Sequence, residues 1–189
     1  MGGVTARLAS QNSDKARELA SALPGWRIEL LATDRMPPEE GSSYYENALA
    51  KARFGRTKAE PGEWTLGEDS GVEVAGLGGA PGLHSARWAE DGVAQVLEEL
   101  RGIEGEGRRA RYVCELVGLS PEGGEYRGTG VLEGRIVHER RGTEGFGYDP
   151  IFAPGGEERT VAELGNEWKA ENSHRARAAR ALLAATGYC

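Results

Sequence analysis

The sequence contains few cysteines and histidines, and this excludes several common kinds of site. Cys114 and Cys189 are the two cysteines among 189 residues, too few for a disulfide framework and consistent with a reducing compartment. The three histidines show no HExxH or paired spacing, which argues against a zinc enzyme. Neither disulfides nor zinc are therefore expected to hold this protein together.

The long apolar segments of membrane and secreted proteins are also missing. No apolar run approaches the roughly 20 residues needed to cross a bilayer. Residues 1–7 have neither the basic start nor the apolar stretch of a secretory signal. These absences predict a cytoplasmic protein that does not act at a membrane.

Positive charge is in deficit, which limits the classes of partner. The net charge of -7 has the wrong sign for a protein whose main task is to grip duplex nucleic acid. A small anionic ligand is still compatible with this charge, because its site needs only a local cluster of donors.

The hydrophobic pattern predicts an α/β fold on a mixed sheet, with residues 1–189 forming one domain. Hydrophobic residues make up 39% and charged residues 28%, as in ordinary globular domains. Residues 33–43 and 76–82 are expected to be loops, and 120–124 a hairpin turn. The expected strands are 4–9, 26–31, 64–66, 72–74, 109–119 and 126–137, and the expected helices begin near residues 12, 45, 93 and 173.

The first candidate ligand site joins the first strand to the first helix. Its residues are Ser10, Gln11, Asn12, Ser13, Asp14 and Lys15. A helix N-terminus presents N–H groups and a partial positive charge, and the lysine adds a full one, so the segment could hold phosphate oxygens. It is not a Walker loop, because GxxxxGK[ST] is absent. A capped helix with an exposed lysine is the simpler explanation of this segment alone.

A pair of adjacent carboxylates forms the second candidate site. Glu68 and Asp69 precede Ser70 and a glycine, where we expect a tight turn between two short strands. Neighbouring side chains on a strand point to opposite faces, but at such a turn both could reach one cation. Magnesium prefers a few carboxylates with water and phosphate oxygens, and Glu46 on the preceding helix is a candidate third ligand. The alternative is a solvated acidic turn.

The third candidate lies in the segment GFGYDP at residues 145–150. Phe146 and Tyr148 alternate with glycines such as Gly147, which let a flat ligand approach the backbone, and Asp149 follows them. Ring stacking combined with edge recognition by a carboxylate suits a nucleobase. A hydrophobic turn before a core strand would explain the same residues.

Cations near the start of the last helix form the fourth candidate. Ser173 is a natural N-cap, which puts His174 and Arg175 in the first helical turn, while Lys169 lies shortly before them. Cations in a first turn oppose the helix dipole, so this placement favours an anion or acceptor as their partner.

These segments occur in an order that resembles one family along nearly the whole chain. They are LASxNxxK at 8–15, YYENAxxKA at 44–52, EDSG at 68–71, GGAPGxxSAR at 78–87, FGYDP at 146–150 and SHR at 173–175. Together they look like the inosine triphosphate pyrophosphatase family, also called the dITP/XTP pyrophosphatases. Six segments in this order are highly specific.

The resemblance implies an elongated α/β fold of two lobes with the active site in a groove between them, in a homodimer. It implies magnesium-dependent hydrolysis of purine nucleoside triphosphates with a non-standard base (ITP, dITP and XTP) to the monophosphate and pyrophosphate. By matching position, residues 10–15 and Lys51 would bind phosphates, and Glu46 and Asp69 would bind magnesium with help from Glu68. Asp69 would activate water, and the nucleoside would contact Ser70, Phe146, Gly147, Tyr148, Asp149, Lys169, His174 and Arg175.

Two other functions stay open on the sequence. One is a septum-inhibitor-type nucleotide pyrophosphatase, which has a similar fold and acts on other modified nucleotides. The other is a non-catalytic nucleotide-sensing or nucleic-acid-binding module that uses the basic C-terminal helix. The acidic net charge and the three carboxylates argue against this second alternative.

Overall fold

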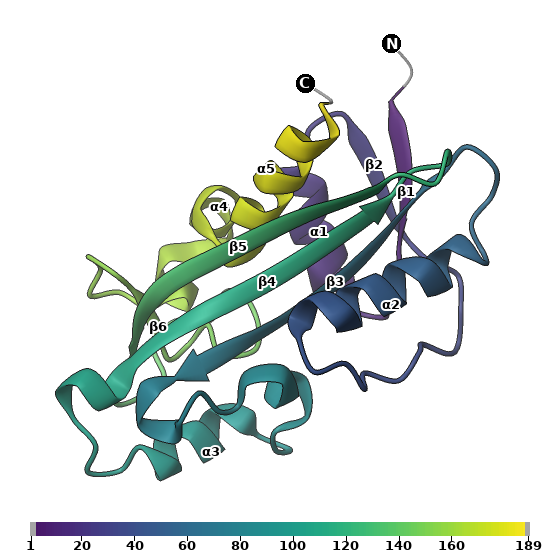
Figure 1. Ribbon diagram of the computed structural model, residues 1–189. Helices are drawn as coiled ribbons and strands as arrows, with labels where there is room; N and C mark the ends of the chain where they lie inside the picture. The colour runs from purple at the N-terminus through teal and green to yellow at the C-terminus, as the bar shows by residue number, and fades with distance from the viewer. Residues whose placement is uncertain (1–2, 188–189) are drawn as a thin grey trace. The chain divides into compact units, whose positions relative to one another are not determined.

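The chain forms two compact units, which the structure, a computed structural model, describes over residues 3–187 (Figure 1). The first unit comprises Met1–Asp69, Cys114–Gly130 and Arg175–Cys189. The second comprises Ser70–Val113 and Val131–His174. The unit boundaries fall inside three long strands, so each of these strands contributes residues to both units.

Six strands form one open, mixed sheet in the order β2-β1-β3-β4-β5-β6. β1 pairs in parallel with β2 and with β3, whereas β5 pairs antiparallel with β6. The predicted α/β fold on a mixed sheet is therefore confirmed. The strands are β1 Val4–Leu8, β2 Trp26–Leu30, β3 Trp64–Val74, β4 Arg109–Leu119, β5 Glu125–Ile136 and β6 Phe152–Pro154.

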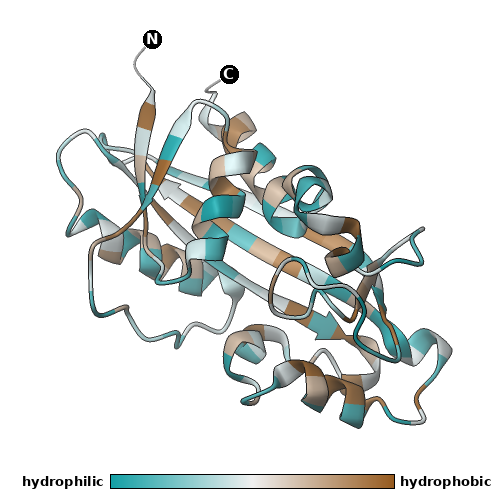
Figure 2. Ribbon diagram, turned by 180° about the vertical axis from the view of Figure 1, so that it is seen from behind, coloured by the Kyte–Doolittle hydropathy of each residue, from teal (hydrophilic) through white to brown (hydrophobic). Residues whose placement is uncertain are grey.

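In the first unit, helices cover both faces of the sheet. α2 (Tyr44–Arg56) lies on one face and packs Ala48 and Ala52 against Val117 and Leu119 of β4. α1 (Ser13–Ala22) and α5 (His174–Thr186) lie on the other face, as Figures 1 and 2 show from opposite sides. The strands carry alternating hydrophobic and hydrophilic bands (Figure 2), as expected when successive side chains point to opposite faces.

The second unit is built around its own hydrophobic core. Buried residues of β3, β4 and β5 pack with α3 (Gly92–Glu99), with β6 and with the start of α4 (Val161–Asn172). The sequence did not predict α4. A capping box of Thr160 and Glu163 begins this helix, but Gly165 interrupts it with a φ of 89° and so breaks the helical period. Three short 3₁₀ segments complete the unit: Ala75–Leu77, Gly82–Arg87 and Gly105–Arg108.

The predicted turn at Glu68 and Asp69 is wrong, because both residues lie inside the continuous strand β3. The neighbouring Gly67 serves close packing rather than a turn. A Cβ atom at this position would lie 1.9 Å from the carbonyl oxygen of Ala48 in α2, so only glycine fits. As successive residues of one strand, Glu68 and Asp69 point to opposite faces of the sheet.

The sequence predicts neither a membrane-spanning helix nor a disulfide. No helix within residues 3–187 is long and apolar enough to cross a membrane. Cys114 is buried and forms no disulfide, while Cys189 lies outside the described residues.

Candidate active site

A buried lysine between two carboxylates forms the centre of the first unit. Lys51 of α2 places its Nζ 2.5 Å from Glu39 Oε1 and 3.0 Å from Asp69 Oδ1. The same ammonium donates to the backbone carbonyl of Glu68, and Asn47 donates from Nδ2 to Asp69 Oδ2 at 3.0 Å. We call Glu39, Asn47, Lys51 and Asp69 the acid–lysine cluster. It brings Lys51 and Asp69 together, both of which the sequence predicted as site residues.

The surroundings of this cluster shift the pKa values of its two central groups, Asp69 and Lys51. Burial raises the pKa of Asp69, and the opposing effects of Lys51 and Asn47 do not cancel the rise. Burial lowers the pKa of Lys51, but Asp69 and Glu39 raise it by more, so the net shift is upward. The fold thus holds a charged lysine beside a carboxylate that binds a proton more readily than usual, as a general base requires.

A series of four alternating charges lies on the other face of β3. Arg175 donates from Nε and Nη2 to Glu68 Oε1 at 3.1 and 2.9 Å, and its Nη1 lies 2.5 Å from Glu18 Oε2. Lys15 is the fourth member, with its Nζ 2.6 Å from Glu68 Oε2. We call Lys15, Glu18, Glu68 and Arg175 the charge series. The sequence favours an anion or acceptor as the partner of Arg175, and in the structure two carboxylates of the chain, Glu18 and Glu68, take that place.

The charge series stabilises the ionised form of Glu68. Burial raises the pKa of this carboxyl, but Arg175 and Lys15 more than offset the effect and hold the pKa well below its usual range. The Cys114 thiol lies 3.5 Å from Glu68 Oε1, and burial together with this carboxylate raises the pKa of the thiol well above its usual value. Glu68 is thus a fixed anion, and of the two adjacent carboxylates only Asp69 suits proton transfer.

The segment at residues 10–15 forms the N-terminus of α1, as predicted. Asn12 accepts hydrogen bonds through its Oδ1 from the backbone N–H groups of Asp14 and Lys15 at 2.9 and 3.2 Å. Ser10 Oγ accepts from the N–H of Asn12, and Gln11 donates to the carbonyl of Asp34. The side chain of Asn12 therefore caps the helix, and the charge that the segment adds is the ammonium of Lys15. Ser13 is the first residue of the helix.

The second unit brings four of the eight predicted nucleoside contacts into one group with Tyr112. Asp149 is buried and accepts from Lys169 Nζ at 2.6 Å, from the N–H of Phe146 at 2.8 Å and from the hydroxyl of Tyr112 at 3.2 Å. The ammonium of Lys169 lies 4.4 Å from the centroid of the Phe146 ring, as in cation–π pairs. The Tyr112 and His174 rings stack 4.4 Å apart, only 5° from parallel. We call these five residues the aromatic cluster.

Three other predicted nucleoside contacts lie elsewhere. Tyr148 is buried, and its hydroxyl donates to the carbonyl of Ser85 at 2.9 Å. Burial raises the pKa of Tyr148 to about 12. Gly147 adopts a left-handed φ of 61° between the two aromatic residues, and Ser70 is half-buried in β3. Phe146 is thus the half-buried ring of the two, while Tyr148 is buried and anchors its own loop.

The three carboxylates predicted to bind magnesium do not converge. Glu46 is exposed and accepts from the backbone N–H and the hydroxyl of Ser42 at 2.6 and 2.8 Å. Glu68 and Asp69 point to opposite faces of the sheet. Between residues 3 and 187, no group of three or more His, Cys, Asp or Glu side chains could hold a metal ion. The carboxylate that shares the Lys51 ammonium with Asp69 is Glu39 rather than Glu46.

Sequence reasoning missed several residues of these groups. Glu39 lies in a loop without hydrophobic periodicity. Its neighbours in the sequence, a proline and a second glutamate, are the only local features that could have pointed to it. Glu18 and Lys15 are three residues apart on α1 and so share one face of that helix. Tyr112 and Cys114 alternate on β4 and therefore point to the same face. These spacings were visible, but their partners come from distant segments of the chain.

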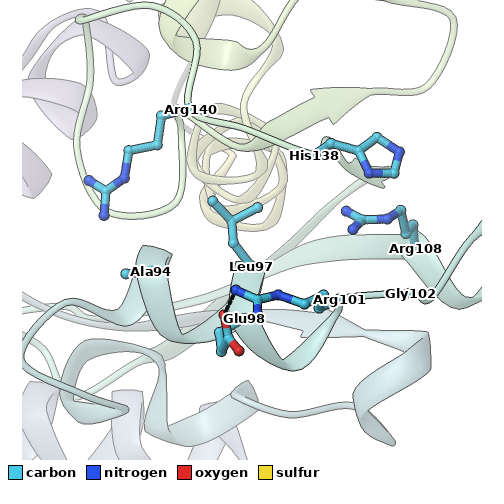
Figure 3. Close-up of a pocket in the computed structure, with 8 residues that line it drawn as sticks. All are labelled: Ala94, Leu97, Glu98, Arg101, Gly102, Arg108, His138 and Arg140. Carbon is cyan, nitrogen blue, oxygen red and sulfur yellow. Dashed lines mark hydrogen bonds and ion pairs between the residues drawn. The ribbon is translucent and has the colours of Figure 1, made fainter.

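A hollow of about 440 Å³ in the second unit is not built from these residues (Figure 3). Its arginines have partners already: Arg101 pairs with Glu98, and Arg140 pairs with Asp91. Arg108 is buried and donates to four backbone carbonyls. The arginines that line the hollow are thus engaged by carboxylates and backbone carbonyls of the fold. The lining residues are Ala94, Leu97, Glu98, Arg101, Gly102, Arg108, His138 and Arg140.

Comparison with known proteins identifies the relatives of this chain. Residues 6–185 match the model of the Ham1 family. A dITP/XTP pyrophosphatase of Thermus thermophilus is 44% identical over 97% of this chain and 92% of the relative. One from Symbiobacterium thermophilum is 45% identical over 90% of this chain and 89% of the relative. The structure of a HAM1 protein from Coxiella burnetii superposes with a TM-score of 0.84 at 33% identity, covering 98% of this chain and all of the other.

Proposed function

The chain belongs to the Ham1 family, and from this premise we propose that it hydrolyses non-standard purine nucleoside triphosphates to the monophosphate and pyrophosphate. The proposed substrates are ITP, dITP and XTP. Its curated relatives are named dITP/XTP pyrophosphatase at 44–45% identity. The observation that carries the proposal is the acid–lysine cluster, in which a carboxylate of raised pKa lies against a charged lysine.

Magnesium fits the donor set of the acid–lysine cluster. Glu39 and Asp69 both lie within 3.0 Å of the Lys51 ammonium, so one cation is already held between these two carboxylates. Two carboxylates with water and substrate phosphates form the set that magnesium prefers. We therefore propose Glu39 and Asp69 as its ligands, in place of the set with Glu46 and Glu68. When bound, magnesium would neutralise charge on the phosphate oxygens.

The chain's own residues supply positioning, positive charge and a base. Lys51 would bind oxygens of the triphosphate as a point charge. Asp69 would accept a proton from the water that attacks the α-phosphorus, and the phosphorus–oxygen bond to the pyrophosphate would break. Asn47 holds Asp69 by one oxygen and so fixes the direction of the other. Phosphoryl transfer needs mainly such positioning and charge neutralisation.

The aromatic cluster would distinguish bases by the polarity of their hydrogen bonds. Hypoxanthine and xanthine carry an acceptor oxygen at C6, where adenine carries an amino donor. Lys169 and His174 belong to the aromatic cluster, and we propose that they supply the donors to this oxygen. Adenine would leave a donor facing a donor, and an unpaired buried group costs about 1–3 kcal/mol. This difference favours ITP and XTP over ATP.

The test is a panel of nucleoside triphosphates with magnesium, in which the released products are identified. We expect ITP, dITP and XTP to be cleaved far faster than ATP, CTP or UTP, with pyrophosphate released in one piece. Equal rates across the panel would refute the base recognition, and release of single phosphates would refute the reaction. The homodimer and the cytoplasmic location stay predictions, and light scattering on the purified protein would test the first.

A further inference from the structure

The loop that carries Phe146 is fastened to the helix that carries Lys169 at one exposed residue. Glu144 is exposed, and its Oε2 accepts from the backbone N–H of Asn166 at 2.8 Å. Its own backbone N–H donates to the carbonyl of Ala162 at 3.4 Å. No sequence motif included Glu144, and neither the reaction nor the base contacts described above use it.

The break in α4 explains why this bond is needed. Gly165 has a φ of 89° and a ψ of 174°, which are not helical values, so the helix starts again at Asn166. The first N–H groups of a helical segment have no acceptor within the segment, and a carboxylate is a favourable one. Glu144 thus caps the second segment of α4 from a different part of the chain.

The capped segment carries a central residue of the aromatic cluster. Lys169 follows Asn166 by three residues and reaches Asp149 at 2.6 Å. Asp149 also accepts from the N–H of Phe146, which lies two residues after Glu144. The loop and the helix segment are therefore joined at two points: by Glu144 at the start of the segment and by Asp149 at Lys169.

We propose that Glu144 is a positioning residue for base recognition, which acts by holding Lys169 and Phe146 in register. This role rests on the proposed function, since the aromatic cluster is taken to bind the base. Without the carboxylate, the N–H of Asn166 would be left to water and the segment would lose its cap. The cluster that binds the reacting phosphates does not include the loop or α4, so catalysis itself would be untouched.

The experiment compares Glu144→Ala, Glu144→Gln and Glu167→Ala in the full chain. Glu144→Gln keeps an acceptor oxygen at the capping position. Glu167→Ala removes a different exposed carboxylate of α4 and controls for surface charge. The measurements are kcat and KM for ITP and ATP, together with hydrogen exchange of the segment 166–169 to follow the cap directly.

Glu144→Ala should raise KM for ITP by about 3- to 10-fold with kcat unchanged, lower the ITP-to-ATP preference and speed exchange at 166–169. Glu144→Gln should restore most of the wild-type behaviour, and Glu167→Ala should match the wild type. A Glu144→Ala protein with wild-type KM and preference, or one whose kcat falls while KM stays fixed, would overturn the role. A wild-type protein without ITP preference would overturn the proposed function, and this role with it.

Discussion

Replacing each of two adjacent carboxylates by its amide should separate stability from catalysis. Glu68 and Asp69 are neighbours on β3, yet their pKa values shift in opposite directions. The pKa of Glu68 lies well below its usual range, so the fold stabilises its ionised form at neutral pH. The pKa of Asp69 is raised, so the fold disfavours its ionised form at the same pH. Glu68→Gln should therefore destabilise the protein, and Asp69→Asn should not.

The contacts set the size of each effect. Glu68→Gln leaves the buried Arg175 with Glu18 alone and removes the anion beside Lys15. Breaking a buried ion pair by removing one partner costs about 3–5 kcal/mol, which corresponds to a fall in Tm of roughly 6–20 °C for a chain of this size. Asp69→Asn keeps an acceptor for Asn47 and leaves Glu39 beside Lys51. Its unfolding free energy should stay within about 1 kcal/mol of the wild type.

The two substitutions should affect catalysis in the reverse order, with the larger loss in Asp69→Asn. Loss of a general base costs about 10²- to 10⁴-fold in kcat, so Asp69→Asn should be nearly inactive while folded. The assay is thermal unfolding in EDTA, followed by ITP turnover with magnesium below the Tm of both variants. An Asp69→Asn protein that is active, or that is as destabilised as Glu68→Gln, would refute the assignment of roles to these two residues.

Three further predictions follow from the same groups. The depressed pKa of Glu68 contributes stability that is present above its ordinary value of 4.5 and is lost as pH falls below it, so acid titration of unfolding should be flatter in Glu68→Gln than in wild type. In a Cys189→Ser background, the buried Cys114 with its raised pKa should react with a thiol reagent at pH 8 only after unfolding, and rapid reaction of the native protein would contradict its burial. His174→Ala should lower kcat/KM for ITP about 10-fold more than kcat/KM for ATP, and an unchanged ITP-to-ATP ratio would contradict a contact between His174 and the base.

Much of the fold could be predicted because its helices and strands are locally encoded. Asn12 caps α1 as the sequence indicated, and the hairpin at 120–124 joins β4 to β5. The predicted turn at Glu68 was wrong because Gly71, the glycine that suggested it, lies inside β3, and a glycine in a strand looks like a glycine in a turn in the sequence. Pairing within the sheet, which joins distant segments of the chain, holds these residues in a strand.

The sequence predicted which residues belong to the site better than it predicted which of them contact one another. Lys51 and Asp69 meet as expected for one site, but the second carboxylate beside them is Glu39, from an irregular loop. Arg175 was assigned to the base, yet it lies between Glu18 and Glu68. Which side chain neutralises a buried charge depends on tertiary packing, and no local pattern records it.

Hydrolysis of ITP in water enriched in ¹⁸O shows which phosphorus atom the water attacks. Attack on the α-phosphorus transfers the oxygen of water to the monophosphate, so mass spectrometry should find the label in IMP and none in pyrophosphate. We expect this result together with much slower turnover of ATP under the same conditions. Label in pyrophosphate or in free phosphate, or equal turnover of ITP and ATP, would contradict it.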